Sequence, residues 1–406
     1  MRSTVKRLLS SKLHRITACA FLVVSASAWA PTGLFAGVSD AGPDATISLI
    51  MRDIEQNKLD VALARTDNLL SMYPNFRLAH LIRGDLLLAR TGALSTFGNA
   101  PGAPAEKLND LRDEAKVRLQ GYKNRPIQNQ IPRYLLQMRE DQNHAVVVDT
   151  QQSRLYLYRN EKGRPVFVAD WYISQGKAGA EKQREGDNKT PVGVYHVTSV
   201  MPREKLTDFY GKRAFPLNYP NEWDKMQGRN GYGIWLHGVP RDTFARPPKS
   251  SEGCVVLANQ DLDALSTYLQ IGLTPVIISN GIEWLTLDDW QTERTALNQA
   301  IENWRKDWES RDVARYLTHY SGKFRSGNQN LESWSKQKRE VATAKSWIKV
   351  DLNKLSVLRN PGNKEEVVMV SFEQDYRSNN LNNIAQKRQY WTKENGRWKI
   401  IYEGVI

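Results

Sequence analysis

Cysteine is scarce in this sequence, with two residues, Cys19 and Cys254, among 406. Cys19 lies in an N-terminal segment that we expect to be removed on export. A single thiol would then remain, which excludes an internal disulfide. Neither the Cys and His residues nor the carboxylates show metal-ligand spacing, so we predict no metal and no cofactor. A lone thiol in an exported protein is either buried and inert or chemically reactive, and composition leaves both readings open.

Acidic residues are absent from the N-terminal stretch before residue 16, where five basic residues occur. An apolar run from Ile16 to Trp29 follows, with small residues around Ala28 and Ala30, which is the pattern of a secretory signal. The run is too short to span a bilayer comfortably. We therefore assign 1–36 to a signal peptide. We expect a periplasmic or cell-envelope protein, anchored in the membrane if the signal is not cleaved.

Motifs that combine basic and aromatic residues for nucleic-acid binding are also missing, although the net charge is +13. Removing the five basic residues of the signal segment reduces this charge to +8. A basic surface favours anionic partners such as a cell-wall polymer or anionic lipid. Without a recognition motif we interpret the charge as a solvated surface and expect no nucleic-acid partner.

Helical periodicity characterises the region 44–139. Apolar residues recur at spacings of three and four from Ile47 to Arg90, with a break at 73–75 and a second helix over 79–88. A charged helix is expected over 106–122. The helix–turn–helix resembles one tetratricopeptide-type unit, which cannot bury its own apolar face. We expect it to pack on another part of the chain or on a second copy, as a homodimer.

The predicted secondary structure changes twice after this region. Many short β-branched and aromatic runs, separated by Gly and Asn turns, predict a mainly-β domain over 140–282. The region 286–406 starts with a helical stretch to Tyr320 and continues with three β-rich stretches. The Glu-Asn-Gly turn at 394–396 predicts a hairpin between the last two strands. A small α+β domain is therefore expected at the C-terminal end.

Two residues of the β domain form a candidate catalytic pair. His237 ends a predicted apolar strand, and Cys254 begins another after a loop. Their separation of 17 positions (254 − 237) allows a strand, a reversing loop and a return, so that imidazole and thiol meet at neighbouring strand ends. A neighbouring imidazole can lower the pKa of a thiol from about 8.5 by several units, and the thiolate then attacks a carbonyl carbon.

The backbone around this pair also suits acyl transfer. Gly253 permits a positive φ and a close approach of the backbone to the reacting centre. The amides of Gly253 and Cys254 are candidate donors to an oxyanion. No carboxylate lies near His237 in the sequence, so a backbone carbonyl is the candidate partner of its Nδ1. Ser251 either orients the catalytic loop or serves only as a turn residue.

Ordered motifs around the pair resemble the YkuD-type L,D-transpeptidase domain. They are the His-Gly at 237–238 with the Ser-Glu-Gly-Cys at 251–254, the strand pattern at 148–156, and the Thr-Pro-Val-Gly-Val-Tyr at 190–195. The resemblance spans about 140–280. It implies a β-sandwich-like fold, a nucleophilic cysteine with a histidine base, and a substrate in the peptide stem of peptidoglycan.

The sequence departs from the family pattern at two positions. Glu252 stands where most members have His, and Val256 stands where many have Arg or Asn. An acidic side chain beside a thiolate disfavours it, unless Glu252 faces solvent or contacts a basic substrate group. These departures leave the acyl acceptor open. They also give weight to a catalytically silent, wall-binding scaffold as an alternative.

Several further residues are candidates for supporting or binding roles. Arginine suits bidentate recognition of stem-peptide carboxylates, although charges in a loop can equally be solvated. The glycines and the serine of the motifs would shape the catalytic loop. The candidates for loop support are Gly238, Ser251 and Gly253, and those for substrate binding are Tyr232, Arg241, Arg246 and Glu252.

The whole layout resembles a subgroup of the family in which a helical region precedes the catalytic domain and a cone-like, nuclear-transport-factor-2-like (NTF2-like) domain follows. Residues 304–320 and 395–400 match that last fold. The resemblance implies a cysteine-dependent L,D-transpeptidase that acts on tetrapeptide stems through an acyl-enzyme and releases terminal D-alanine. Because the subgroup includes LD-carboxypeptidases that influence cell shape, trimming of tetrapeptides to tripeptides is the alternative. In the last domain, binding or dimerisation is favoured over a second activity.

Overall fold

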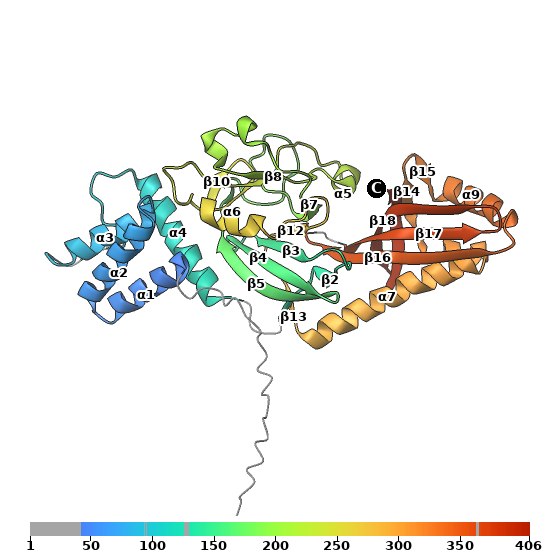
Figure 1. The fold of residues 1–406 in the computed structure, drawn as a ribbon, viewed down its shortest axis with the longest axis horizontal. Helices are drawn as coiled ribbons and strands as arrows, with labels where there is room; N and C mark the ends of the chain where they lie inside the picture. Colours follow the sequence, from blue (N-terminus) through green and yellow to red (C-terminus); the bar gives the residue numbers. More distant parts are fainter. Residues whose placement is uncertain (1–41, 93, 95, 126–129, 363–364) are drawn as a thin grey trace, which may run out of the picture. The chain divides into compact units, whose positions relative to one another are not determined.

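The structure of the protein, a computed structural model, describes residues 42–92, 94, 96–125, 130–362 and 365–406 (Figure 1). The expected signal peptide, 1–36, lies outside the described residues. Within those ranges, no helix combines the length and the apolar character needed to cross a bilayer.

The helical region has one more break than the periodicity predicted. The expected interruption at 73–75 and the charged helix near 106–122 are confirmed. A further interruption at 56–58 was missed; there Asn57 has a φ of 56° and ends the first helix early. The helices described in this region are α1 (Pro43–Glu55), α2 (Leu59–Met72), α3 (Arg77–Leu88) and α4 (Ala105–Lys123).

The apolar face of the helical region is buried against the catalytic domain. Ile47, Leu69 and Leu78 are fully buried in one cluster that the helices share. Phe244 and Ala258, from the catalytic domain, belong to the same cluster. Of the two expected partners for this face, another part of the chain therefore covers it in the structure. Dimerisation through this region stays a prediction.

A buried group of charges joins the helical region to the catalytic domain. Asp44 of α1 lies 2.6 Å from Arg118 of α4 and also pairs with Arg154 of the catalytic domain. Arg154 pairs in addition with Asp170, and Arg118 lies 2.8 Å from Glu114. Burial alone would raise the pKa of Asp44, but the two guanidinium groups lower it overall. The carboxylate is therefore kept ionised between two arginines.

The first sheet of the catalytic domain is buried on both faces. In strand β3, Val146 and Val148 face one core, while Ala145 and Val147 face another. This two-sided burial explains the unbroken apolar run that marks the strand in the sequence. The sheet order is β5-β4-β3-β12-β7, with β3 (His144–Asp149), β4 (Arg154–Glu161), β5 (Arg164–Tyr172), β7 (Gly193–His196) and β12 (Pro275–Ser279).

A second, smaller sheet packs on the first and carries the candidate catalytic residues. Phe215, Leu236 and Val255 of this sheet share a core with the first sheet, as the β-sandwich-like expectation requires. The remaining short elements here are β6 (Gln175–Gly176), the 3₁₀ turns η1 (Arg203–Lys205) and η2 (Asp208–Tyr210), α5 (Glu222–Met226), β10 (Lys249–Ser251) and α6 (Asn259–Ser266). The sheet order is β11-β9-β8, with β8 (Ala214–Pro216), β9 (Trp235–His237) and β11 (Val255–Val256).

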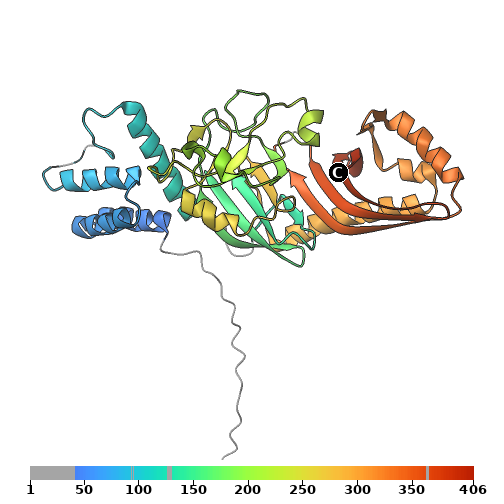
Figure 2. The ribbon, with the colours of Figure 1, turned by 45° about the horizontal axis from the view of Figure 1, so that its top comes forward.

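The C-terminal domain has long antiparallel strands with helices lying against the sheet (Figure 2). Val368, Val370 and Phe372 pack on its helices, whereas Val367 and Met369 of the same strand pack on the catalytic domain. The hairpin at 394–396 is confirmed. The elements are α7 (Leu287–Glu309), α8 (Val313–Leu317), β14 (Tyr320–Ser326), β15 (Gln329–Asn330), α9 (Leu331–Thr343), β16 (Ile348–Asn360), β17 (Val367–Ser378), β18 (Asn382–Glu394) and β19 (Arg397–Val405).

Two short strands that precede the catalytic domain in the sequence pair with strands that follow it. β1 (Ile131–Pro132) pairs antiparallel with β13 (Trp284–Leu285). β2 (Leu135–Gln137) forms the edge of the C-terminal sheet beside β16. The part of the expected helical region from residue 131 onward therefore belongs to the β structure. The catalytic domain is inserted between these pairings.

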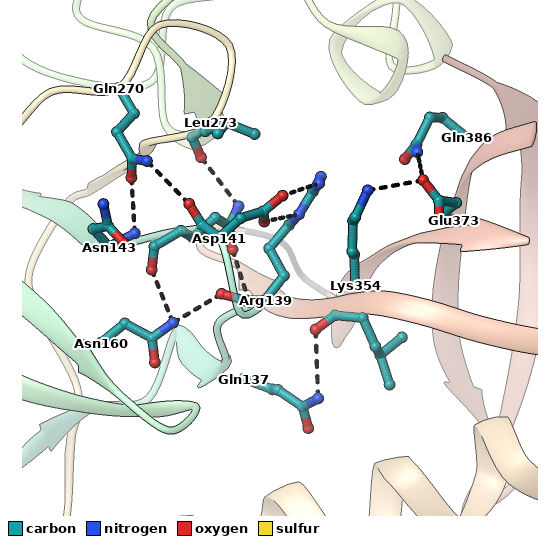
Figure 3. A network of polar contacts seen from close by, with 12 residues as sticks. Gln137, Arg139, Asp141, Asn143, Asn160, Gln270, Leu273, Lys354, Glu373 and Gln386 are labelled. Carbon is teal, nitrogen blue, oxygen red and sulfur yellow. Dashed lines mark hydrogen bonds and ion pairs between the residues drawn. The ribbon is translucent and has the colours of Figure 1, made fainter.

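The segment that leads from β2 into the catalytic domain is held by polar contacts on both sides (Figure 3). Asn160 donates from Nδ2 to the Arg139 carbonyl oxygen at 2.8 Å, and Gln270 donates to that of Asp141 at 3.0 Å. On the other side, Gln137 donates to the carbonyl oxygen of Leu355 in β16 at 3.4 Å. The segment is thus bonded to the catalytic domain and to the C-terminal sheet.

We predict that Asp44→Asn weakens the junction of the helical region. Two buried arginines would lose their shared counter-charge, which typically costs about 3–5 kcal/mol. The folded-state pKa of Asp44 lies below its ordinary value of 3.8, so its contribution is present above that pH and lost as the pH falls through the lowered pKa. Native-state hydrogen exchange of α1 and α4 amides at pH 7 measures the change.

Asp67→Asn is the matched control for this substitution. It removes an ion pair with Arg83 whose side chains are 42% and 47% exposed, so it should cost less than about 1 kcal/mol. Equal effects of the two substitutions would show that the buried charges do not hold the junction.

Candidate active site

A cavity of about 380 Å³ in the catalytic domain is lined by both candidate catalytic residues, His237 and Cys254. Four of the predicted supporting and binding residues also line it: Ser251, Tyr232, Arg246 and Glu252. The remaining lining residues are Lys182, Glu185, Gly186, Asn188, Phe209, Tyr210, Gly233, Ile234 and Trp235.

The pairing of β9 with β11 places the thiol and the imidazole on one face. The strands are parallel, and Leu236 lies opposite Val255 in the register. Both of these side chains point into the core. Because side chains alternate along a strand, His237 and Cys254 face the opposite side, toward the cavity. The expectation of neighbouring strands is confirmed, but the second strand runs parallel to the first and does not return antiparallel to it.

His237 is held by its own neighbour in the backbone. Its Nδ1 donates to the carbonyl oxygen of Gly238 at 2.7 Å, which confirms that a carbonyl replaces a carboxylate here. This bond places the ring proton on Nδ1 and leaves Nε2 as the basic nitrogen. Tyr210 packs edge-on against the imidazole, with ring centres 5.1 Å apart. A Cβ on Gly238 would clash with Asn259 Oδ1, which explains the glycine after the histidine.

The loop before the thiol is built around Ser251. Its hydroxyl donates to the Cys254 carbonyl oxygen at 2.7 Å and accepts from the Gly253 amide at 3.1 Å. Ser251 therefore orients the loop. Gly253 has a φ of 131°, and a Cβ there would meet the Lys189 carbonyl oxygen at 2.7 Å. The Gly253 amide, a predicted oxyanion donor, is engaged by Ser251 in the structure. The Cys254 amide remains the candidate donor.

The thiol and the imidazole are both neutral in the substrate-free protein. Burial raises the pKa of Cys254 to about 11, and the Trp235 amide and the Arg246 guanidinium lower it only in part. Burial lowers the pKa of His237 to about 4. Consistently, the thiol donates to the Gly233 carbonyl oxygen at 3.2 Å. The expectation of a thiol pKa lowered by the imidazole is therefore wrong for this state, because the sequence does not reveal how deeply the pair is buried.

Some of the candidate substrate-binding residues line the cavity, and one does not. Arg246 lies at the cavity, where its guanidinium stacks over Phe209 at 4.2 Å and donates to the Phe209 carbonyl oxygen at 2.9 Å. The Glu252 side chain is 81% exposed and lies 4.0 Å from Lys177, so it faces solvent beside the cavity mouth. Arg241 is not a lining residue; it is 81% exposed and pairs with Asp208. Its assignment to substrate binding is not supported by its position.

Sequence reasoning missed three residues that shape the cavity. Phe209 and Tyr210 come from the 3₁₀ turn η2 and pack beside the imidazole. Lys182 is buried, and its Nζ lies 2.8 Å from Asp187 Oδ1. Burial alone would raise the pKa of Asp187, but Lys182 and three backbone amides lower this pKa to about 2. Asp187 belongs to the Gly-Asp-Asn-Lys stretch before the Thr-Pro motif, and this stretch could have indicated a role for Asp187 and its partner. No sequence pattern indicated a role for Phe209 and Tyr210.

Metal ligands are not gathered at this site. Glu185 and Glu252 are the acidic residues among its lining. In the part of the chain that the structure describes, no group of three or more His, Cys, Asp or Glu side chains is placed to share a metal ion. The thiol and the imidazole are the groups in position for covalent and proton-transfer chemistry.

Comparison with known protein families gives two matches. The L,D-transpeptidase catalytic domain, YkuD, matches residues 143–278. The Cds6 C-terminal NTF2-like domain matches residues 296–404. Their order and positions agree with the resemblances found in the motifs, and both ranges fall within the expected domains.

Comparison with individual proteins gives longer alignments to two solved structures and a shorter one to a curated relative. Bd1075 of Bdellovibrio bacteriovorus is 28% identical, with a TM-score of 0.61 over 68% of this chain and 98% of that chain. The helical cell shape determining protein Pgp2 of Campylobacter jejuni is 26% identical, with a TM-score of 0.57 over 66% and 95%. The candidate L,D-transpeptidase YafK of Escherichia coli (strain K12) is 31% identical over 88 residues, 22% of this chain and 31% of YafK.

The match to YafK spans about a third of that curated relative, so it supports the catalytic domain and not the whole protein. The two solved structures are covered almost completely, and their alignments span 68% and 66% of this chain. The cavity with its thiol and imidazole lies in the part that the catalytic family matches. The chain therefore contains a YkuD L,D-transpeptidase catalytic domain, and an NTF2-like domain of the Cds6 type follows it.

Proposed function

We propose that this protein is a cysteine-dependent peptidoglycan L,D-transpeptidase of the cell envelope. It would act on tetrapeptide stems through an acyl-enzyme at Cys254 and release terminal D-alanine. The observation that carries the proposal is the placement of Cys254 and His237 on one face of paired strands, both lining an open cavity. The bond from Nδ1 to Gly238 supports it further, because it leaves Nε2 available as a base.

In the proposed first step the thiol attacks the carbonyl carbon between the third residue and the terminal D-alanine. His237 accepts the thiol proton on Nε2 as the carbon–sulfur bond forms, since neither group is charged beforehand. The Cys254 amide would stabilise the oxyanion. The imidazolium then protonates the leaving nitrogen, the carbon–nitrogen bond breaks, and D-alanine departs. A thioester remains on Cys254.

In the second step the thioester passes to an acceptor. An amine would give a cross-link or an attached protein, whereas water would give a trimmed tripeptide. His237 takes a proton from either acceptor, and the thiol is regenerated. The likeness to a helical cell shape determining protein supports the hydrolytic alternative, LD-carboxypeptidase activity with a role in cell shape.

The silent-scaffold alternative rested on Glu252 and Val256, and their positions weaken it. The exposed Glu252 side chain leaves the cavity open. Val256 is buried, and its backbone exchanges two hydrogen bonds of 2.9 Å with Ser174. Neither substitution displaces the thiol or the imidazole from the cavity. A protein retaining this geometry is expected to react.

We predict that Cys254→Ala and His237→Gln abolish turnover of purified tetrapeptide muropeptides. Loss of the nucleophile should reduce the rate by at least about 10³-fold, and loss of the base by about 10²–10⁴-fold. Chromatography with mass spectrometry identifies the products: tripeptide monomers indicate hydrolysis, and dimers indicate transfer. His196→Gln is the matched control. Burial lowers the pKa of His196 to about 4, as it does for His237, but His196 does not line the cavity.

His196→Gln should retain activity within about threefold. An unchanged rate in Cys254→Ala would contradict the proposal, as would an inactive wild-type protein.

We predict that Cys254 of the substrate-free protein reacts with iodoacetamide slowly at pH 7. Its pKa is raised to about 11, so the thiolate fraction, and with it the rate, should rise about tenfold per pH unit up to at least pH 10. Mass spectrometry of the Cys254 peptide at each pH measures the rate. A plateau at or below neutral pH would instead demonstrate a preformed thiolate–imidazolium pair.

We predict that Arg246→Gln raises KM for the tetrapeptide by about tenfold with a smaller change in kcat, because its guanidinium is the one beside the thiol suited to binding a stem-peptide carboxylate. Arg241→Gln is the matched control from the same loop and should leave KM unchanged, since Arg241 is outside the cavity lining. Equal KM values for both variants would exclude Arg246 from substrate binding.

A further inference from the structure

The loop 239–248 connects the His237 segment with β10, and it packs against the helical region. Phe244 of this loop is 8% exposed and inserts among the helices. Its ring lies 4.3 Å from that of Phe76 and 4.9 Å from that of Tyr73, measured between centres. Asn75 also donates from Nδ2 to the Arg241 carbonyl oxygen at 3.4 Å. The turn between α2 and α3 therefore receives the loop.

The same loop is fixed at its other end by the catalytic domain. The hydroxyl of Tyr172 donates to the Arg246 carbonyl oxygen at 2.8 Å, and that of Ser174 donates to the same oxygen at 2.9 Å. The Arg246 side chain leaves this anchored backbone in the direction of the cavity. The packing of Phe244 and the hydrogen bonds to the Arg246 carbonyl oxygen thus fix the backbone from which the guanidinium extends.

Both anchors meet at one residue of the helical region, Arg118. Its guanidinium carbon lies 3.8 Å from the centre of the Tyr172 ring and 5.8 Å from that of Phe244. Arg118 is itself held by ion pairs to Asp44 and Glu114 at 2.6 and 2.8 Å. A cation stacked on an aromatic face in a buried site is a stabilising contact. Through Arg118 the helical region thereby contacts both anchors of the loop, Phe244 and Tyr172.

We propose that the helical region 43–123 is a positioning element of the active site, which holds the loop 239–248 so that Arg246 faces the cavity beside Cys254. Phe244 and Arg118 are its positioning residues; neither touches the reacting atoms. The helical region would thus set the affinity for the donor peptide without taking part in the chemistry. The role of Arg246 rests on the proposed function, whereas the anchoring of the loop does not.

The anchoring is tested in the full chain by Phe244→Ala, with hydrogen–deuterium exchange of the amides in 239–250 as the readout. Loss of the ring should increase exchange in this segment by about tenfold or more, because local opening becomes easier. Phe244→Leu, which keeps an apolar side chain, should restore most of the protection. Leu86→Ala is the matched control: Leu86 is 3% exposed in the same cluster but lies about 15 Å along α3 from Phe76.

The consequence for binding is tested by kinetics with tetrapeptide muropeptides. Phe244→Ala should raise KM about three- to tenfold with kcat within about twofold of wild type, whereas a general loss of structure would lower kcat as well. Leu86→Ala should change neither. Unchanged exchange in Phe244→Ala would overturn the anchoring, and faster exchange with unchanged KM would overturn the role in binding. An inactive wild-type protein would count against the proposed function alone, and exchange would still decide the anchoring.

Discussion

The parallel pairing of β9 with β11 is the constraint on which the catalytic geometry depends. One strand ends at His237 and the other begins just after Cys254. Their register turns Leu236 and Val255 into the core and leaves the imidazole and the thiol facing the cavity. A slip of one residue in either strand would turn its reactive side chain toward the core. The core between the two sheets therefore fixes which way the two candidate catalytic side chains face, as well as the fold.

Burial of this pair has a consequence for the mechanism. It raises the pKa of Cys254 and lowers the pKa of His237, so the thiol and the imidazole are both neutral at pH 7. A neutral thiol is also protected, since a thiolate is the reactive form toward oxidants and unwanted electrophiles. In the proposed mechanism, proton transfer to His237 would therefore be coupled to attack on the substrate. The surrounding elements act on this pair indirectly: Ser251 shapes the loop, and the helical region supports the loop that carries Arg246.

Local motifs predicted much of the molecule, and features that depend on distant contacts were missed. The Ser-Glu-Gly-Cys loop, the carbonyl partner of Nδ1 and the hairpin at 394–396 follow from short-range chemistry. The direction of β11 does not, because 17 residues can return a chain in either sense. The strand Leu135–Gln137 was missed because it has three residues, and its partner in β16 lies more than 200 positions away. The pKa directions required burial, which the sequence does not contain.

The central claim is a covalent intermediate on Cys254, and intact-mass spectrometry of the protein quenched in acid during turnover of a tetrapeptide muropeptide tests it most directly. The account predicts a mass increase equal to the substrate less D-alanine, located on the peptide that contains Cys254 and released by hydroxylamine, as expected of a thioester. D-alanine release with no adduct under any quench time, or an adduct on another residue, would contradict it.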